Sequence, residues 1–555
     1  MSQTLTPSAE DGLPIPEGAA DLIETEYTVG QDNITPRIGP LGLDIHNPVF
    51  GISSVLVMAF VIVTLAFQNV MGEAMGALRN TLTSSFDWFF LSAGNIILLV
   101  ILGILVSPLG RVRIGGTEAT PDYSYLGWLA MLFAAGMGIG LMFFGVLEPL
   151  YYFATPWGDQ PFMGTVAVND GALADPATVE AARRMAMAAT IFHWGLHPWA
   201  IYAVVALSLA LFAYNKGLPL TMRSMFYPIL GERVWGWPGH VIDILAVFAT
   251  LFGLATSLGF GAQQATAGIG YVLGIEGLND TSIIAVLLIA GITSLALISV
   301  LRGLDGGIKR LSELNMGLAL LLLVFVLLAG PTLLLITQFF GNLGAYASEA
   351  LSLSNPVGRE DDGFRQGWTA FYWAWWVSWA PFVGMFIARI SRGRTVREFL
   401  TCVLIVPTLV CALWMTVFGG TAIAQMTATV SESAVYAYVV EAYVPELSLF
   451  AMLSELPLSQ ITFVIAIVLI VVFFVTSADS GSLVIDTITA GGKIDAPVSQ
   501  RVFWVVFLGL VASALLLGGG LAALQAAAVS TGLPFSLVLL VASFALVKGL
   551  MTEPR

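Results

Sequence analysis

The stretch Trp368-Thr-Ala-Phe-Tyr-Trp-Ala-Trp-Trp-Val-Ser-Trp-Ala-Pro381 places five tryptophans, one tyrosine and one phenylalanine in a single apolar segment of membrane-spanning length. Tryptophans of membrane proteins commonly mark helix ends at the headgroups, but Trp375, Trp376 and Trp379 lie well inside the segment 367–390. On an α-helix they fall within an arc of about 100°. A quaternary ammonium has no N–H to donate and is bound by aromatic ring faces, at about 2 kcal/mol per desolvated contact. The segment therefore predicts a transmembrane helix that forms part of a quaternary ammonium cage.

The composition predicts an all-α integral membrane protein. The chain is 57% hydrophobic and only 10% charged, and its apolar stretches repeatedly exceed the roughly 20 residues that cross a bilayer. The sequence predicts twelve spans, at 47–67, 88–107, 125–147, 184–213, 238–262, 282–301, 314–337, 367–390, 399–424, 459–484, 501–519 and 523–547, with an extension toward Gly274 as an alternative end of the fifth.

The distribution of basic residues predicts the orientation. With both termini inside, 17 of the 22 Lys and Arg residues fall in cytoplasmic segments, as expected for a multi-pass protein of the plasma membrane, here a bacterial inner membrane. Residues 1–45 are acidic and lack a signal peptide, so they are expected to form a disordered cytoplasmic tail. The net charge of −14 makes nucleic acid an unsuitable partner.

A glycine run interrupts the third span, at Ala134-Ala-Gly-Met-Gly-Ile-Gly-Leu-Met142. Gly136, Gly138 and Gly140 each cost roughly 1 kcal/mol in a helix relative to alanine, which favours unwinding, although close helix packing is an alternative. The eighth span, five spans later, contains Pro381 and Gly384 and is also expected to be broken. Broken helices in corresponding positions are typical of transporters built from inverted repeats.

This symmetry divides the chain into six parts. They are a tail (1–45), two additional spans (46–120), a first repeat of spans 3 to 7 (121–338), an amphipathic connecting segment (339–366), a second repeat of spans 8 to 12 (367–547) and a short cytoplasmic tail (548–555).

The fourth span carries a second group of aromatic residues. Trp194, Trp199 and Tyr202 cover an arc of about 140°, which would narrow if Pro198 bends the helix. His193 and His197 are spaced for a metal, but no third ligand is evident, and hydrogen bonding within the bundle is the preferred interpretation. Cys402 and Cys411 share one helix in the ninth span, nine residues apart, so we expect packing roles for both and no disulfide.

The tenth span contains Phe473-Phe-Val-Thr-Ser-Ala-Asp-Ser-Gly-Ser482. Its hydroxyl and carbonyl oxygens suit Na⁺, a hard cation, although hydroxyls also serve helix packing. Asp479, an ionisable residue at membrane depth, is a candidate functional residue; an alternative role is to hold backbone or hydroxyl groups near the ion site.

Together these motifs resemble the betaine/choline/carnitine transporter family over about His46 to Met551. The most specific parts are Gly136-Met-Gly-Ile-Gly140, His193-Trp-Gly-Leu-His197 and Trp373-Ala-Trp-Trp-Val-Ser-Trp379. The resemblance implies a leucine-transporter-type fold with an inverted five-helix repeat in spans 3 to 12, plus two N-terminal helices. It also implies a homotrimer, with residues 339–354 as the amphipathic helix at its interface.

The same resemblance assigns candidate site residues. The aromatic box falls on Trp194, Trp199, Tyr202, Trp375, Trp376 and Trp379, with Phe371 as a gating aromatic and Gly136, Met137, Gly138 and Gly140 as backbone that meets substrate. One sodium site would use Ala134, Met137, Phe473, Thr476 and Ser477, and a second Thr250 and Phe382. Leu254 stands where the sodium-coupled pattern has a second threonine, which puts the second site in doubt.

The expected activity is uptake of a zwitterionic, glycine betaine-like solute by Na⁺ symport. Choline-transporting relatives tend to carry an aspartate where this chain has Gly140, and an unpaired buried cation is costly. Dimethylsulfoniopropionate, carnitine, choline and ectoine remain alternative substrates, and Na⁺-independent exchange or H⁺ symport alternative mechanisms. We expect no enzymatic activity, no cofactor other than Na⁺ as coupling ion, and no C-terminal osmosensor.

Overall fold

The computed structural model describes residues 15–38, 41–136, 138–155, 167–169, 171–275, 277–278, 282–303 and 309–555. Three two-stranded antiparallel ladders pair β1 with β4, β2 with β3 and β5 with β6. The strands are β1 (Asn33–Ile34), β2 (Arg37–Ile38), β3 (Leu41–Gly42), β4 (Ile45–His46), β5 (Val168–Asn169) and β6 (Ala172–Leu173). The α-helices are α1 (Asn47–Ala66), α2 (Gln68–Val106), α3 (Tyr125–Gly136), α4 (Ile139–Ala154), α5 (Pro176–Trp194), α6 (Leu196–Ala210), α7 (Tyr227–Leu230), α8 (Trp237–Leu273), α9 (Ser282–Gly303), α10 (Lys309–Ala329), α11 (Thr332–Ser354), α12 (Asp362–Phe364), α13 (Ala370–Ile390), α14 (Val396–Ala428), α15 (Ser448–Ser454), α16 (Ser459–Thr489), α17 (Val498–Leu517) and α18 (Gly520–Met551).

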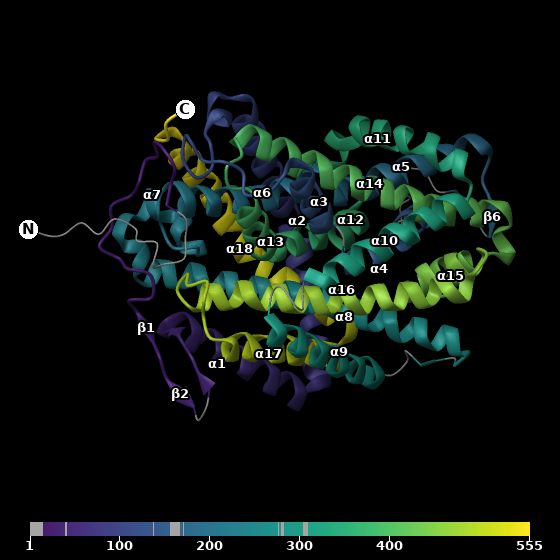
Figure 1. The fold of residues 1–555 in the computed structure, drawn as a ribbon. Helices are drawn as coiled ribbons and strands as arrows, with labels where there is room; N and C mark the ends of the chain where they lie inside the picture. The colour runs from purple at the N-terminus through teal and green to yellow at the C-terminus, as the bar shows by residue number, and fades with distance from the viewer. Residues whose placement is uncertain are drawn as a thin grey trace, which may run out of the picture.

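The predicted all-α membrane architecture is confirmed. Among the described residues, ten helices of 20 to 40 residues are apolar enough to span a membrane, and the bent pair α3–α4 provides up to one more. The trace also shows both described ends of the chain, with α7, at one end of the bundle and β6 with α15 at the other (Figure 1). Helix α13, the predicted eighth span, has 21 residues and is not among these ten helices.

The third span is interrupted at the glycine run, as the sequence predicts. Helix α3 ends at Gly136 and α4 begins at Ile139, with Gly138 in an extended conformation (φ −174°, ψ −177°). The two helices are bent by 63°. The predicted unwinding is therefore present, and Met137 lies outside the described residues.

The eighth span differs from its prediction, because α13 runs unbroken through Pro381 and Gly384. Gly384 is instead a close-packing residue: a Cβ there would lie 2.5 Å from Cγ1 of Val205 on α6. The glycine thus lets α13 and α6 approach each other, which is the alternative role of small residues in membrane helices.

The fourth span is broken at Gly195 and not bent at Pro198. Gly195 (φ −98°, ψ −132°) separates α5 from α6, whereas Pro198 sits in the first turn of α6, where its missing N–H costs nothing. The hydroxyl of Tyr346 on α11 accepts a 3.2 Å hydrogen bond from the Leu196 backbone N–H next to the break.

Two further segments differ from their predicted bounds. The seventh span, predicted as 314–337, ends at Ala329 because Gly330 and Pro331 stop α10, and the amphipathic helix begins at Thr332 rather than at Phe339. Of the tail predicted to be disordered over 1–45, the described part from residue 15 onward is packed against the protein: Glu17 pairs with Arg392 (2.5 Å) and Asp21 with Lys216 (2.6 Å).

The C-terminal end is also held in place. The predicted tail 548–555 begins inside α18, which continues to Met551, and Glu553 is buried against Lys216 (2.7 Å). At the centre of the bundle, α13 packs against α6, α8 and α18, while α14 covers α3 and α4. This arrangement brings the two aromatic helices, α6 and α13, beside the broken third span.

Candidate functional site

A cavity lies where α4, α6 and α13 meet. Its lining contains eight of the predicted substrate residues, Gly138, Gly140, Trp194, Trp199, Tyr202, Trp375, Trp376 and Trp379, together with Leu141, Pro198, Val383 and Cys411. The structure thus gathers residues from three separate stretches of sequence around one space. The predicted gating residue Phe371 lies one turn before Trp375 and stacks on it, with ring centroids 5.5 Å apart.

The indole N–H groups of the cavity are all engaged by protein acceptors. Trp376 donates to the His193 carbonyl (2.9 Å) and Trp379 to the Gly253 carbonyl (2.9 Å). Trp375 donates to the Ser257 hydroxyl, Trp199 to the Trp194 carbonyl and Trp194 to a carboxylate oxygen of Glu148. Because these bonds fix the rings and use their donors, the rings present carbon surfaces to the cavity.

The rings stand at steep angles to one another, which is the geometry of a cage. Trp194 meets Trp376 edge to face at 4.8 Å and 72°, and Tyr202 meets Trp376 at 6.3 Å and 81°. Trp375 stacks beside Trp376 at 4.8 Å. Faces turned toward a common space in this way surround a methylated ammonium from several sides.

The break in the third span presents a helix N-terminus to the same cavity. Gly138 is the N-cap of α4 and has no side-chain cap hydrogen bond, so the first N–H groups of the 16-residue helix have no capping side chain. Such an end attracts a carboxylate through its free N–H groups and its dipole. Gly140 allows the rings to approach, since a Cβ there would lie 2.7 Å from Cη2 of Trp194 and 3.1 Å from Cη2 of Trp375.

A buried carboxylate behind the cage was missed by the sequence analysis. Glu148 on α4 is fully buried and accepts hydrogen bonds from Trp194 Nε1 (2.8 Å), the Tyr372 hydroxyl (2.6 Å) and His193 Nδ1 (2.6 Å). The predicted third span ended at 147, which placed Glu148 in an outer loop. The apolar run that continues to Ala154 is the signal that could have found it.

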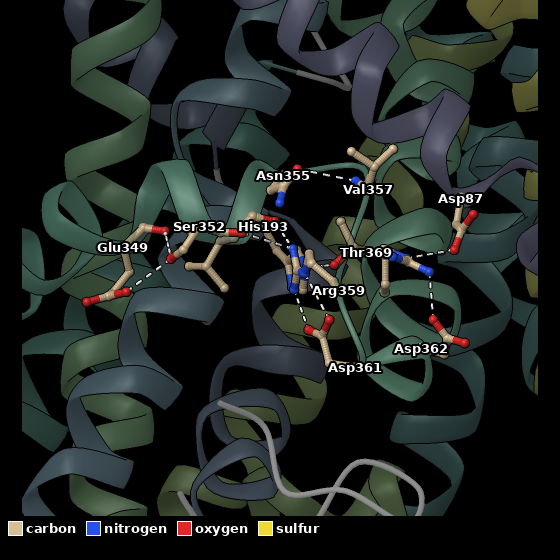
Figure 2. A network of polar contacts seen from close by, with 12 residues as sticks. Asp87, His193, Glu349, Ser352, Asn355, Val357, Arg359, Asp361, Asp362 and Thr369 are labelled. Atoms are coloured by element: carbon tan, nitrogen blue, oxygen red, sulfur yellow. Dashed lines mark hydrogen bonds and ion pairs between the residues drawn. The ribbon is translucent and has the colours of Figure 1, made fainter. Parts of the chain in front are cut away.

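Both histidines form hydrogen bonds within the helix bundle, which is the interpretation preferred from the sequence. His193 Nε2 lies 2.9 Å from the Thr369 hydroxyl, and His197 Nε2 contacts Asn95 at 3.0 Å. Figure 2 shows His193 and Thr369 next to Arg359, whose guanidinium pairs with Asp361.

The candidate sodium residues lie on α3, α8, α13 and α16. On α16 the Thr476 hydroxyl donates to the Val472 and Phe473 carbonyls of its own helix, and Ser477 is half-buried. On α8 the Thr250 hydroxyl donates to the Ala246 carbonyl (2.7 Å). Leu254, one turn later, is fully buried and would lie 2.2 Å from a Cβ at Gly481, so it fills the space between α8 and α16. Ala134 lies on α3, two residues before its end, and Phe382 packs on Trp379.

Asp479 is tied into the protein by two partners. It accepts a hydrogen bond from Ser299 on α9 (2.7 Å) and pairs with Arg501 on α17 (2.8 Å). Holding a hydroxyl group is one of the two roles expected for it. The sequence analysis did not predict this ion pair.

Both cysteines are buried, and no disulfide joins them. Cys402 lies 3.3 Å from the Tyr125 hydroxyl. Cys411 lines the cavity beside the aromatic cage, a position that the packing role predicted for it did not anticipate.

Comparisons with known proteins identify the family of the chain. Residues 48–555 match the model of the betaine/carnitine/choline family of transporters. A protein of Vibrio parahaemolyticus named glycine betaine/proline/choline transporter is 58% identical, over 98% of this chain and 97% of its own. A second protein of that organism, named glycine betaine transporter 1, is 54% identical over 95% of this chain and 97% of its own. The glycine betaine transporter of Acinetobacter baylyi is 41% identical over 91% of this chain and 74% of its own. The chain is therefore a transporter, not an enzyme, and belongs to the betaine/carnitine/choline transporter family.

Proposed function

We propose that the protein imports a zwitterionic quaternary ammonium solute of the glycine betaine type by Na⁺ symport. The observation that carries this proposal is the pairing of two complementary surfaces in one cavity. The rings around Trp376 suit a trimethylammonium group, and the N-terminus of α4 at Gly138 suits a carboxylate. A zwitterion with both groups satisfies both surfaces at once.

Sodium coupling rests on the set of oxygen-bearing residues expected from the sequence. The proposed ion site uses Ala134 on α3 with Phe473, Thr476 and Ser477 on α16, and it needs only oxygen ligands. Met137, also expected at this site, lies outside the described residues. A second site at Thr250 and Phe382 is disfavoured, since Leu254 carries a hydrocarbon side chain where the sodium-coupled pattern has a second threonine. Moving one charge across 100 mV supplies about 2.3 kcal/mol, and the sodium gradient adds to it. One ion per cycle is therefore sufficient for concentrative uptake.

The proposed architecture completes twelve spans by counting α13 and the bent pair α3–α4. Spans 3 to 7 and 8 to 12 form inverted repeats that rock against each other, so that the cavity opens alternately to the two sides of the membrane. The proposed location is the bacterial inner membrane, with both termini cytoplasmic. Their common position at one end of the bundle supports this (Figure 1).

The assembly proposed is a homotrimer that contacts its neighbours through α11. Leu333, Phe340 and Leu351 are 77%, 69% and 85% exposed, and their spacing puts them on one face of the helix. The opposite face, with Asn342 and Tyr346, is buried against the protein. An exposed apolar face on a connecting helix fits either lipid or a neighbouring subunit.

Uptake of radiolabelled glycine betaine into proteoliposomes, with and without an inward Na⁺ gradient, tests the proposal. Trp376→Leu removes one cage ring and should weaken apparent affinity by about tenfold or more. Trp88→Leu is the matched control, because Trp88 is 50% exposed on α2, away from the cavity. Uptake that does not depend on the Na⁺ gradient would point to exchange or H⁺ symport. Absence of betaine uptake would point to dimethylsulfoniopropionate, carnitine or ectoine.

Choline is the second candidate substrate. The name of the Vibrio relative includes choline, and choline lacks the carboxylate that would occupy the α4 N-terminus. Gly140 provides no negative charge, so a choline cation has to be compensated elsewhere in the site.

A further inference from the structure

We propose that Glu148 provides the negative charge that lets the aromatic cage accept a cationic ligand, so that this residue sets the balance between choline and zwitterions. The inference rests on the proposed function, and it concerns a residue in the polar layer directly behind the cage.

The carboxylate of Glu148 is one indole ring away from the cavity. Trp194 lines the cavity, and the Nε1–H of its ring donates a hydrogen bond to Glu148. No side chain at Gly140 can reach the cage without displacing Trp194 and Trp375. Glu148 therefore supplies from behind the rings what an acidic residue at 140 would supply from within the cavity.

The hydrogen-bond pattern of Glu148 fits the ionised carboxylate. An indole N–H acts only as a donor, and the Tyr372 hydroxyl and the His193 Nδ1–H add two more donors, all at 2.6 to 2.8 Å. The Tyr152 hydroxyl is hydrogen-bonded to the same carboxylate. His193 does not need a second proton, because the Thr369 hydroxyl can donate to its Nε2 at 2.9 Å (Figure 2). With a neutral imidazole, the cluster carries one negative charge.

The neighbouring cation is already matched. Arg359 pairs with Asp361, through Nε at 2.8 Å from Oδ1, so it does not cancel the charge of Glu148. A buried carboxylate bonded to the N–H of an indole also makes the ring face more electron-rich, which strengthens its attraction for a cation. Both effects favour choline, whereas a zwitterion carries its own carboxylate and gains less from either.

Glu148→Gln tests the charge with little change in shape. The amide oxygen can accept from Trp194 and Tyr372, and the amide N–H can donate to His193 Nδ1 once that ring protonates Nε2, which then donates to Thr369. The full-length purified protein would be assayed for equilibrium binding of labelled choline and labelled glycine betaine at saturating Na⁺. The Kd for choline should rise about tenfold or more, the effect of a unit charge across one ring in a protein interior, and the Kd for betaine should change less than about threefold.

Two further variants separate charge from structure. Tyr372→Phe removes one hydrogen bond from the same carboxylate oxygen but keeps the charge, so the ratio of the two Kd values should stay at the wild-type value. Glu148→Asp retains the charge and should retain choline binding where Glu148→Gln loses it. If Glu148→Gln does not fold, the wild type still provides a test: choline should bind far more tightly than its neutral carbon isostere 3,3-dimethyl-1-butanol, and equal binding would overturn the inference.

The outcomes test the proposed function and the role of Glu148 separately. Wild-type protein that binds neither solute would refute the proposed function, and this inference with it. Wild-type protein that binds betaine but not choline, or an unchanged ratio in Glu148→Gln, would refute the inference alone. A ratio that shifts equally in Tyr372→Phe would show that packing, and not charge, is responsible.

Discussion

Replacing Gly140 by alanine should damage the substrate cage while leaving the fold in place. The added Cβ would lie 2.7 Å from Cη2 of Trp194 and 3.1 Å from Cη2 of Trp375, where ordinary van der Waals contact begins at about 3.4 Å. The Trp194 ring would therefore have to retreat by about 0.7 Å. It is not free to do so, because its Nε1 is bonded to Glu148 and its ring meets Trp376 at 4.8 Å.

The size of the effect follows from the contact that is disturbed. A desolvated cation–π contact contributes about 2 kcal/mol, and losing half to all of one corresponds to about a 5- to 30-fold rise in Kd for glycine betaine. The assay is equilibrium binding of labelled betaine to the purified variant, normalised to folded protein. Alanine is also a better helix former than glycine by about 1 kcal/mol, so stability should fall little.

Two glycine-to-alanine controls locate the effect. A Cβ at Gly549 on α18 would lie 2.8 Å from Cζ of Phe212, outside the cavity lining, so this variant reports a clash of similar size away from the substrate. A Cβ at Gly317 on α10 meets no described atom within 4 Å. Wild-type affinity in Gly140→Ala, or an equal loss in Gly549→Ala, would show that the cage geometry was misread.

Two predictions concern charges elsewhere. Asp479→Asn leaves Arg501 buried without its partner and should lower the free energy of unfolding by about 3 kcal/mol. Ser299→Ala removes one hydrogen bond and should lower the free energy of unfolding by about 1 kcal/mol. Similar shifts in melting temperature for the two variants would argue against a charged pair. Burial opposes ionisation of Asp21, but hydrogen bonds from Lys216 and Thr552 outweigh it and lower its pKa from 3.8. The contribution of the Asp21–Lys216 pair to this attachment is therefore complete above about pH 4 and is lost as the pH falls through the lowered pKa. Increased amide exchange around residue 21 already at pH 5 would contradict this.

The sequence predicted the cage because its signal is local. Trp375, Trp376 and Trp379 share a helix face whatever surrounds them, and the glycines at 136–140 interrupt their own helix. Glu148 was missed for the opposite reason: its acidic side chain suggested the end of a span. Its hydrogen-bond partners on α5 and α13, distant in the sequence, show why it is buried.

Helix boundaries and terminal segments also depended on distant partners. Pro381 looks like a break in the sequence, but α13 continues through it, supported by its packing against α6 and α8. Glu17 and Asp21 lie in an acidic stretch that reads as disordered, and their basic partners are residues 392 and 216. Composition alone does not reveal such pairings.

The described N-terminal segment is held to the rest of the protein by ion pairs. It is fastened by Glu17 to the loop after α13, by Asp21 to the end of the α6 region and by Asp44 to Lys493 after α16. Glu17 and Asp21 are each about half exposed, and attraction between exposed charges fades as dissolved ions shorten its range from about 10 Å at 0.1 M to about 3 Å at 1 M. The attachment of the N-terminal segment should therefore weaken as the salt concentration of the compartment it faces rises.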